Sequence, residues 1–409
     1  MNDAVDDRHR AGFKHRTRVA DAVEALRAVV TPHDRTERVP LAAADGRALA
    51  EPVTATRDVP HYRRAAMDGF AVRARDTFGA SRRSPEIVER VRDGDLPPSG
   101  AVRVHTGSAL PDGADAVVKI EDTAEYGDEI EVFDAVAEGE NVGQVGEDVA
   151  TGRHLYDPGH RLRPSDLGLL KSVDVREVAV YELPDVAVVP TGEEVVQSEP
   201  GPGEVVETNG LTVTRLVERW GGTARYRDVV TDDHGVLREA IERDLDADVV
   251  VTTGGSSVGA RDLVPDVVSE LGEVVVHGVA LKPGHPVALG AVEDTPVVML
   301  PGYPVACIIN AVQFLRPALK WAGHLPVEDL PTTEARLAGK LVSEPGVRTF
   351  ARVTLRADDD GSVAEPVRSS GSGILSSVAL SDGWVVVPEA TEGIAAGETV
   401  SVERWEWSP

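Results

Sequence analysis

The stretch DVVVTTGGSSVGARD, residues 248–262, decides how this chain folds. It opens with three consecutive valines, an apolar run typical of a strand buried on both faces of a sheet. Small residues and glycines follow, and a helix is expected after Asp262. A buried strand, a Gly/Ser turn and a helix start form a cradle of backbone N–H groups that suits a phosphate or another oxyanion. Taken alone, such a turn is also found as a simple tight connection. The candidate binding residues of this turn are Thr253, Gly254, Gly255, Ser256, Ser257 and Gly259.

Strand-like and helix-like segments alternate on both sides of this stretch, from residue 184 to residue 321. Apolar runs predict strands at 186–189, 224–230, 249–253, 274–277 and 297–300. Periodic segments predict helices at 208–220, 234–245, 263–271 and 304–321. Such alternation indicates a parallel sheet with helices on both faces. We therefore expect a doubly wound α/β module at the centre of the chain.

The regions outside this module have shorter signals. A helix is expected at 17–30, and short strand-like runs between 87 and 133, separated by turn residues, predict a small all-β unit. After a proline-bounded linker at 326–331, further short runs predict a second β-domain at the C-terminal end. The chain is therefore expected to have several domains.

Composition limits the kinds of partner. The 409 residues carry a net charge of −27, and only six of the 42 basic residues are lysine. This acidic, lysine-poor balance suits a very salty cytoplasm, so we expect a halophilic, haloarchaeal source. Because no basic stripe is available to neutralise phosphates, generic nucleic-acid binding is disfavoured. No apolar run reaches the roughly 18 residues of a membrane helix, so we expect no membrane contact and a cytoplasmic location.

Acidic residues follow three of the predicted strands. Ligands of an open α/β sheet bind beyond the carboxyl ends of its strands, and Glu194, Asp232 and Asp262 all lie at such positions. Carboxylates beside a phosphate cradle suit Mg²⁺, which prefers oxygen ligands. The alternative is that each acid caps a helix or faces solvent. We predict that the three acids together form a magnesium site.

Two proline-rich loops add further candidates. Lys282 lies in KPGHP, where it can offer a positive charge to an oxyanion, and His285 of the same loop can add a second donor. The second loop, LPGYP at 300–304, follows another predicted strand. Cys307 has apolar neighbours and is interpreted as a core residue, not a nucleophile. The histidines and the single cysteine show no zinc-ligand spacing.

Seven motifs together resemble the molybdopterin molybdenumtransferase family, the MoeA-type molybdenum insertases related to the E domain of gephyrin. They occur in the family's order and cover the chain from about residue 17 to its end. The motifs are AAMDGFAV (65–72), VHTGSALPDGADAVV (104–118), GENVGQVGEDV (139–149), VPTGEEV (189–195), TTGGSSVGARD (252–262), LKPGHPVALG (281–290) and LPGYPVA (300–306).

The resemblance implies a fold. It consists of the α/β molybdopterin-binding module, an elongated domain made of two segments, a small inserted β-domain and a C-terminal β-barrel, assembled as a homodimer. The implied boundaries are a disordered tail at 1–16, the elongated domain at 17–52 and 140–182, the inserted domain at 53–139, the α/β module at 183–326 and the barrel at 327–409.

The resemblance also implies an activity. This is the Mg²⁺-dependent insertion of molybdate into adenylylated molybdopterin, which releases AMP and molybdenum cofactor. The implied partners are adenylylated molybdopterin, molybdate and, transiently, the adenylyltransferase or apo-molybdoenzymes. Positions tied to activity are Asp68, Thr106, Asp148, Glu194, Asp232 and Asp262. Positions implied at the substrate crevice or at the oxyanion are Lys282, His285, Pro301, Gly302, Pro304, Arg352 and Ser372.

The chain departs from the family pattern around the expected oxyanion. His285 replaces a lysine, Tyr303 an asparagine and Ala306 a serine. These changes leave tungstate as an alternative to molybdate. Two other functions stay open: a molybdopterin adenylyltransferase, which the α/β module alone resembles, and a gephyrin-like dimeric scaffold without activity.

Overall fold

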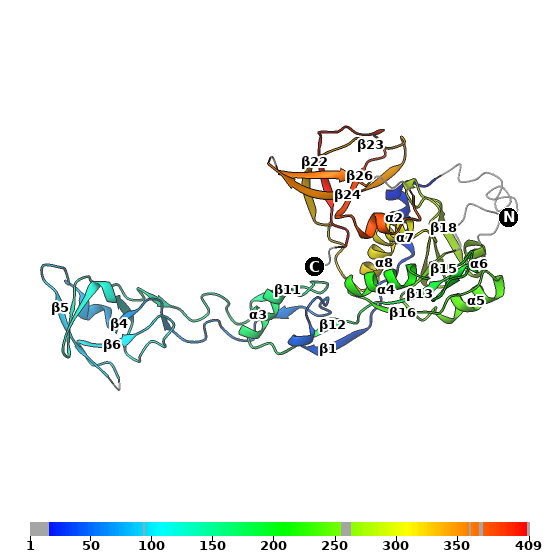
Figure 1. Cartoon of the computed structure of the whole chain (residues 1–409). Helices are drawn as coiled ribbons and strands as arrows, with labels where there is room; N and C mark the ends of the chain where they lie inside the picture. The colour runs from blue at the N-terminus through cyan, green and yellow to red at the C-terminus, as the bar shows by residue number, and fades with distance from the viewer. Residues whose placement is uncertain (1–15, 93–94, 255–262, 360, 368–370, 407–409) are drawn as a thin grey trace.

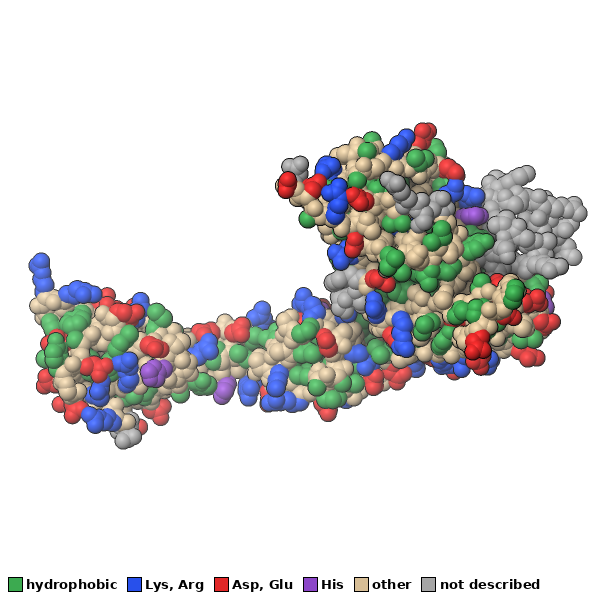
Figure 2. Space-filling view, viewed as in Figure 1, with side chains coloured by type: hydrophobic (Ala, Val, Ile, Leu, Met, Phe, Trp, Pro, Cys, Tyr) green, Lys and Arg blue, Asp and Glu red, His purple; other side chains and the backbone are tan. Residues whose placement is uncertain are grey.

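A computed structural model describes residues 16–92, 95–254, 263–359, 361–367 and 371–406. The molecule is elongated: a β-rich unit lies at one end, the α/β module and the C-terminal barrel lie at the other, and a thin arm joins them (Figure 1). On the visible face acidic and basic side chains are interspersed along the whole length (Figure 2). The expected tail at 1–16 lies outside the described residues except for Arg16.

The α/β module is built on one six-stranded sheet. Four neighbouring strands are parallel, as predicted, and the valine run of residues 249–251 lies at the centre. The sequence predicted a parallel sheet, but at one edge β20 (Ala288–Val292) is antiparallel to both of its neighbours. A tight hairpin joins β20 to β21 without a helical crossover. The strand order is β16 (Thr223–Tyr226), β13 (Asp185–Pro190), β17 (Val249–Thr253), β21 (Thr295–Leu300), β20 (Ala288–Val292) and β18 (Glu273–His277).

Helices cover both faces of this sheet, as predicted. Alternate residues of each strand point to opposite faces, so Val249 and Val251 join one apolar cluster and Val250 joins the other. On the first face lie α2 (Val19–Val29), α4 (Asn209–Arg219), α7 (Pro304–Asn310), a π-helical turn (Ala311–Leu315) and α8 (Arg316–Ala322). On the second face lie α5 (His234–Arg243) and α6 (Leu263–Leu271).

The arm consists of two chain segments that run side by side. Three short antiparallel pairs join residues before the inserted unit to residues after it, so the two segments support each other. The pairs are β1 (Thr36–Pro40) with β12 (Glu177–Tyr181), β2 (Val53–Thr54) with β11 (His154–Tyr156), and β3 (Arg64–Ala65) with β10 (Val142–Gly143), and α3 (Pro164–Ser172) packs beside them.

The inserted unit is a six-stranded sheet around Phe70, which is fully buried. Strand-like runs at 88–91, 102–105, 116–120 and 130–133 predicted four of its strands. The sequence missed β4 (Gly69–Val72), which follows the Asp68–Gly69 turn, and β8 (Thr123–Tyr126), which is partly exposed. The strand order is β7 (Ala116–Lys119), β4 (Gly69–Val72), β6 (Gly100–Val104), β5 (Glu86–Arg90), β9 (Glu129–Val132) and β8 (Thr123–Tyr126).

The C-terminal sheet closes into a barrel because β24 pairs with β26 as well as with β25. One strand of the α/β module, β19 (Leu281–Lys282), pairs with the start of β24 and joins the two domains. The barrel strands are β24 (Arg348–Asp358), β25 (Gly361–Pro366), β22 (Thr332–Leu337), β28 (Thr399–Glu403) and β26 (Gly383–Val387). Smaller elements are β14 (Val195–Val196), β15 (Val205–Val206), β23 (Leu341–Val342), β27 (Gly393–Ile394) and α9 (Ser376–Ala379).

Two expectations about individual features can be compared with the structure directly. Cys307 is fully buried in α7, which confirms its place in the core, and burial raises the pKa of its thiol. None of the helices in the described parts of the chain has the length and apolar character that crossing a membrane requires.

Candidate functional site

The loops that follow three parallel strands meet at the carboxyl edge of the sheet. Pro190, Thr253 and Leu300 are the last residues of β13, β17 and β21 and stand in register. Gly254 lies so close to the next loop that an added Cβ would be 2.0 Å from the carbonyl oxygen of Thr191. Its φ of 147° also favours glycine. The predicted turn therefore begins where the sequence placed it, whereas Gly255, Ser256, Ser257, Gly259 and Asp262 lie outside the described residues.

Two of the three predicted metal-binding acids lie close together at this edge. Burial, and next the nearby charge of Glu194, raise the pKa of Asp232. A backbone β-bridge between Thr191 and Val230 joins the loops that carry the two acids. Among the described residues, no group of three or more His, Cys, Asp or Glu side chains is arranged to hold a metal. The structure thus brings two carboxylates together, and the third predicted ligand, Asp262, is not described.

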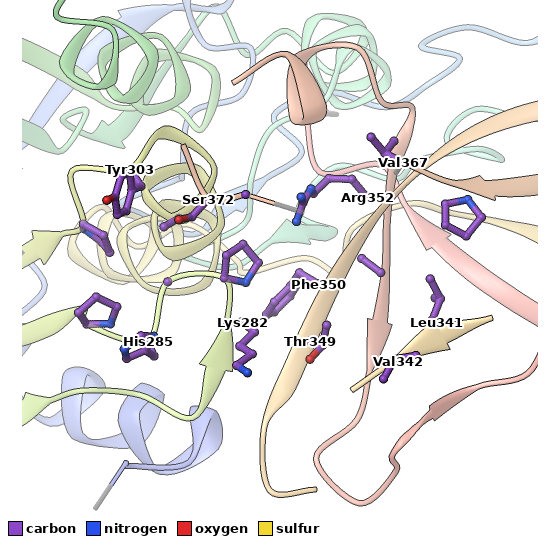
Figure 3. Close-up of a pocket in the computed structure, with 18 of the residues that line it drawn as sticks. Lys282, His285, Tyr303, Leu341, Val342, Thr349, Phe350, Arg352, Val367 and Ser372 are labelled. Carbon is purple, nitrogen blue, oxygen red and sulfur yellow. The ribbon is translucent and has the colours of Figure 1, made fainter. Parts of the chain in front are cut away.

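A pocket of about 780 Å³ opens between the α/β module and the barrel (Figure 3). Its lining includes five residues predicted from the sequence, which come from chain segments up to 90 positions apart: Lys282, His285, Pro301, Arg352 and Ser372. Gly302 and Pro304 flank this lining in the 300–304 loop, where Pro304 is the first residue of α7. Pairing of β19 with β24 brings the KPGHP loop to the barrel.

The pocket lining includes the cations Lys282, Lys340 and Arg352. Arg352 extends from β24 toward Ser372 (Figure 3), and although burial lowers its pKa, an arginine stays charged at neutral pH. The ammonium group of Lys282 forms an ion pair with Glu344, which shares its charge before any ligand arrives. The planar guanidinium of Arg352 can donate to two oxygens of one oxyanion, which suits it to that role.

His285 is half-buried in the same pocket. Burial lowers its pKa, and the positive charges of Arg16 and Lys282 lower it further. The imidazole is therefore neutral at pH 7 and above, where it can still donate one N–H hydrogen bond. The KPGHP loop therefore carries one permanent cation, Lys282.

Hydrogen bonds hold the 300–304 loop from two sides. Asn209, at the start of α4, donates from Nδ2 to the carbonyl oxygen of Gly302 at 2.7 Å. The backbone N–H of Val305 donates to the carbonyl oxygen of Ser372 at 3.0 Å. Sequence reasoning missed Asn209 and Glu344 because their roles depend on contacts between distant segments.

The remaining predicted residues lie away from the pocket within one chain. Thr106 donates to Oδ1 of Asp68 from its backbone N at 2.7 Å and from Oγ1 at 2.8 Å, and these bonds lower the pKa of Asp68. Both residues belong to the inserted unit, which lies at the opposite end of the molecule (Figure 1). Asp148 is exposed in the arm, where its backbone N–H donates to Val59 at 3.0 Å.

Family models match almost the whole chain. Residues 17–173 match the MoeA N-terminal region (domains I and II), residues 187–321 a molybdopterin-binding domain, and residues 334–405 the MoeA C-terminal region (domain IV). The chain is 36% identical over 391 residues to a protein of Methanocaldococcus jannaschii, covering 93% of this chain and 94% of that one. It is 31% identical over 401 residues to the molybdopterin molybdenumtransferase of Bacillus subtilis, covering 91% and 92%.

A solved structure has the same overall fold. The crystal structure of the molybdopterin biosynthesis MoeA protein from Pyrococcus horikoshii OT3 superposes with a TM-score of 0.81 at 30% identity, covering 95% of this chain and 99% of that chain. Similarity thus extends over the arm, the inserted unit, the α/β module and the barrel together. The chain belongs to the MoeA family.

Proposed function

We propose that this chain inserts molybdate into adenylylated molybdopterin, releasing AMP and molybdenum cofactor. It is an enzyme of the molybdopterin molybdenumtransferase kind, similar along its length to curated enzymes of that name. The observation that carries the proposal is the juxtaposition of two parts: the glycine-containing strand ends around Gly254, and the pocket that contains Arg352 and Lys282. Gly302 connects them, since an added Cβ there would lie 3.5 Å from Cα of Gly254.

The two parts suit different portions of the substrate. Backbone N–H groups at the strand ends would bind the phosphates of the adenylylated pterin. In the pocket, the Arg352 guanidinium and the Ser372 hydroxyl would bind the oxygens of molybdate, and Lys282 would leave its ion pair with Glu344 and bind the oxyanion instead. An acidic protein thereby holds an anionic substrate with a few local cations. Tungstate, which has the same charge and nearly the same size, is the alternative oxyanion.

The acids at the sheet edge fit Mg²⁺. The carboxylates of Glu194 and Asp232 are oxygen donors of like charge, and burial together with the nearby charge of Glu194 raises the pKa of Asp232. These two residues, with Asp262 as the proposed third ligand, would hold the ion. Bound Mg²⁺ would neutralise phosphate charge and polarise the phosphoanhydride. The protein's own contribution would be to hold the two carboxylates at the sheet edge from which the Gly254 turn starts.

A second copy of the chain would complete the site. Asp68, Thr106 and Asp148 match family positions tied to activity, yet in one chain they lie away from the pocket. In a homodimer the inserted unit or arm of one copy can approach the pocket of the other. We assign the reaction to the cytoplasm of a halophile, on the basis of the acidic, lysine-poor composition.

The alternatives predict different products. A molybdopterin adenylyltransferase would release pyrophosphate from ATP and molybdopterin, and a scaffold would assemble without turnover. The test is incubation with adenylylated molybdopterin, Mg²⁺ and either molybdate or tungstate, followed by measurement of AMP and of reconstituted apo-molybdoenzyme. AMP release that depends on the oxyanion supports the proposal. Pyrophosphate release from ATP, or binding without turnover, would contradict it.

A further inference from the structure

Tyr303 presents a large aromatic ring at the edge of the pocket. Its side chain is part of the pocket lining (Figure 3), and the residue is 61% exposed. One edge of the ring contacts the barrel loop, because a Cβ added to Gly373 would lie 3.3 Å from Cδ1 and 3.6 Å from Cε1 of Tyr303. The ring therefore rests on the barrel loop and leaves much of its surface open to a ligand.

The backbone under this ring is held in place. Pro301 and Pro304 restrict the chain on both sides of it. Asn209 binds the carbonyl of Gly302 from α4, and the carbonyl of Tyr303 accepts a 2.8 Å hydrogen bond from the N–H of Cys307 in α7. An exposed ring on a fixed backbone loses little conformational freedom when a ligand packs against it.

Tyr303 also lies between the two parts of the proposed site. The preceding residue, Gly302, approaches Gly254 at the strand ends, and Val305 in the first turn of α7 donates its N–H to the carbonyl oxygen of Ser372. The proposed substrate carries adenine and a pterin, each with a flat conjugated pyrimidine ring, at opposite ends of its phosphate bridge. A ligand with its phosphates at the strand ends and an oxyanion near Arg352 would pass across the face of Tyr303.

We infer that Tyr303 is a substrate-stacking residue: one heteroaromatic ring of the adenylylated pterin packs on its phenol ring. The inference rests on the proposed function, and it assigns to the Tyr303 ring the selection of ligands that carry a flat aromatic ring. Stacking depends on the π-face and not on the hydroxyl, so phenylalanine should replace tyrosine here, whereas alanine or asparagine should not.

The experiment measures binding of AMP, molybdopterin and molybdate separately, by calorimetry on the full-length protein. AMP carries only the adenine ring and molybdopterin only the pterin ring, so the two arms identify which ring stacks. The variants are Tyr303→Ala and Tyr303→Phe. Tyr126→Ala serves as the matched control, because Tyr126 is 63% exposed but lies on β8 of the inserted unit.

Tyr303→Ala should weaken one of the two ring-bearing ligands by about 5- to 150-fold, as loss of a stacked ring does, and leave molybdate binding unchanged. Tyr303→Phe and Tyr126→Ala should bind all three ligands like the wild type. The inference is overturned if Tyr303→Ala binds AMP and molybdopterin normally, or if Tyr303→Phe loses as much affinity as the alanine variant. Failure of the wild type to release AMP would instead contradict the proposed function, because ring binding is measured without turnover.

Discussion

The side-chain amide of Asn209 donates a 2.7 Å hydrogen bond to the carbonyl oxygen of Gly302. This bond joins the first turn of α4 to the loop that follows β21, which carries Pro301 and Tyr303 into the pocket. The loop is thus held by a residue 93 positions earlier in the chain. Its position depends on the packing of α4 against the sheet.

Removing this bond should loosen the loop more than it destabilises the protein. Asn209→Ala is expected to lower the free energy of unfolding by about 0.5–1.5 kcal/mol, the usual contribution of one hydrogen bond. AMP release should fall at least tenfold, since a displaced loop misplaces the pocket. Urea denaturation and the AMP assay measure the two effects. Full activity in a folded Asn209→Ala variant would show that the bond does not position the loop.

The ion pair between Lys282 and Glu344 should compete with molybdate. Glu344→Gln removes the competing carboxylate and should tighten molybdate binding by about two- to tenfold, an effect that decreases with added salt. Calorimetry at low and high ionic strength measures it. Glu389→Gln is the matched control, because it removes a barrel carboxylate paired with Arg348 outside the pocket lining. Equal effects from both variants would indicate only a general change in charge.

The ionised carboxylate of Asp232 should lower the stability of the fold while being needed for activity. Its pKa is raised in the folded state, so the ionised carboxylate destabilises the fold at neutral pH, and this penalty is lost as pH falls through the raised pKa. Asp232→Asn should therefore keep or slightly increase stability at pH 7, by about 1 kcal/mol or less because the group is only partly buried. Activity should fall by more than about 100-fold if Asp232 binds Mg²⁺.

The neighbouring Asp233 provides the control for this experiment. Its side chain caps α5 by accepting hydrogen bonds from the N–H groups of Gly235 and Val236, and asparagine can keep that cap. Asp233→Asn removes the same charge but should retain activity. Normal turnover of Asp232→Asn in the presence of Mg²⁺ would remove Asp232 from the reaction.

His285 should limit oxyanion affinity at alkaline pH. Its lowered pKa makes it neutral at pH 8, so His285→Lys restores a cation and should tighten molybdate binding about threefold or more. At acidic pH the wild-type imidazole begins to gain a proton, and the difference between the two proteins should narrow. The measurement is molybdate binding at both pH values. His154→Lys, an exposed change in the arm, should have no effect, and unchanged affinity in His285→Lys at pH 8 would exclude His285 from the binding site.

The net charge of −27 should make stability dependent on salt. Raising KCl from about 0.1 M to about 3 M shortens the Debye length from about 10 Å to below 3 Å, which weakens repulsion among acidic side chains. The Tm should rise by more than about 5 °C over this range. A scanning calorimeter measures it. A Tm that stays constant or falls would contradict the expected halophilic origin.

The sequence predicted the parts of the fold that depend on local pattern. The valine run of β17 indicated a central buried strand, and Pro304 correctly marked the start of a helix. The sequence did not reveal β20, whose alanines and Gly290 resemble a loop more than a strand. This strand pairs through a hairpin, and pairing direction is a non-local property.

The sequence predicted several residues of the pocket, but not that they line one cavity between the α/β module and the barrel. Lys282 and Arg352 line the same pocket because Leu281 pairs with Arg348, 67 positions later in the chain, a register that no local pattern encodes. Contacts such as Lys282 with Glu344 follow from that register. Conversely, Asp68 and Thr106 were recognised from motifs within the expected inserted domain, but the hydrogen bonds between them became apparent only from the structure.

The most direct test of the account is the dependence of AMP release on molybdate concentration in the wild type and in Arg352→Ala. Adenylylated molybdopterin and Mg²⁺ would be saturating in both. If the pocket between module and barrel binds the oxyanion, AMP release requires molybdate, and Arg352→Ala needs at least about tenfold more of it for half-maximal release. AMP release without molybdate, or the same half-maximal concentration in both proteins, would contradict that claim.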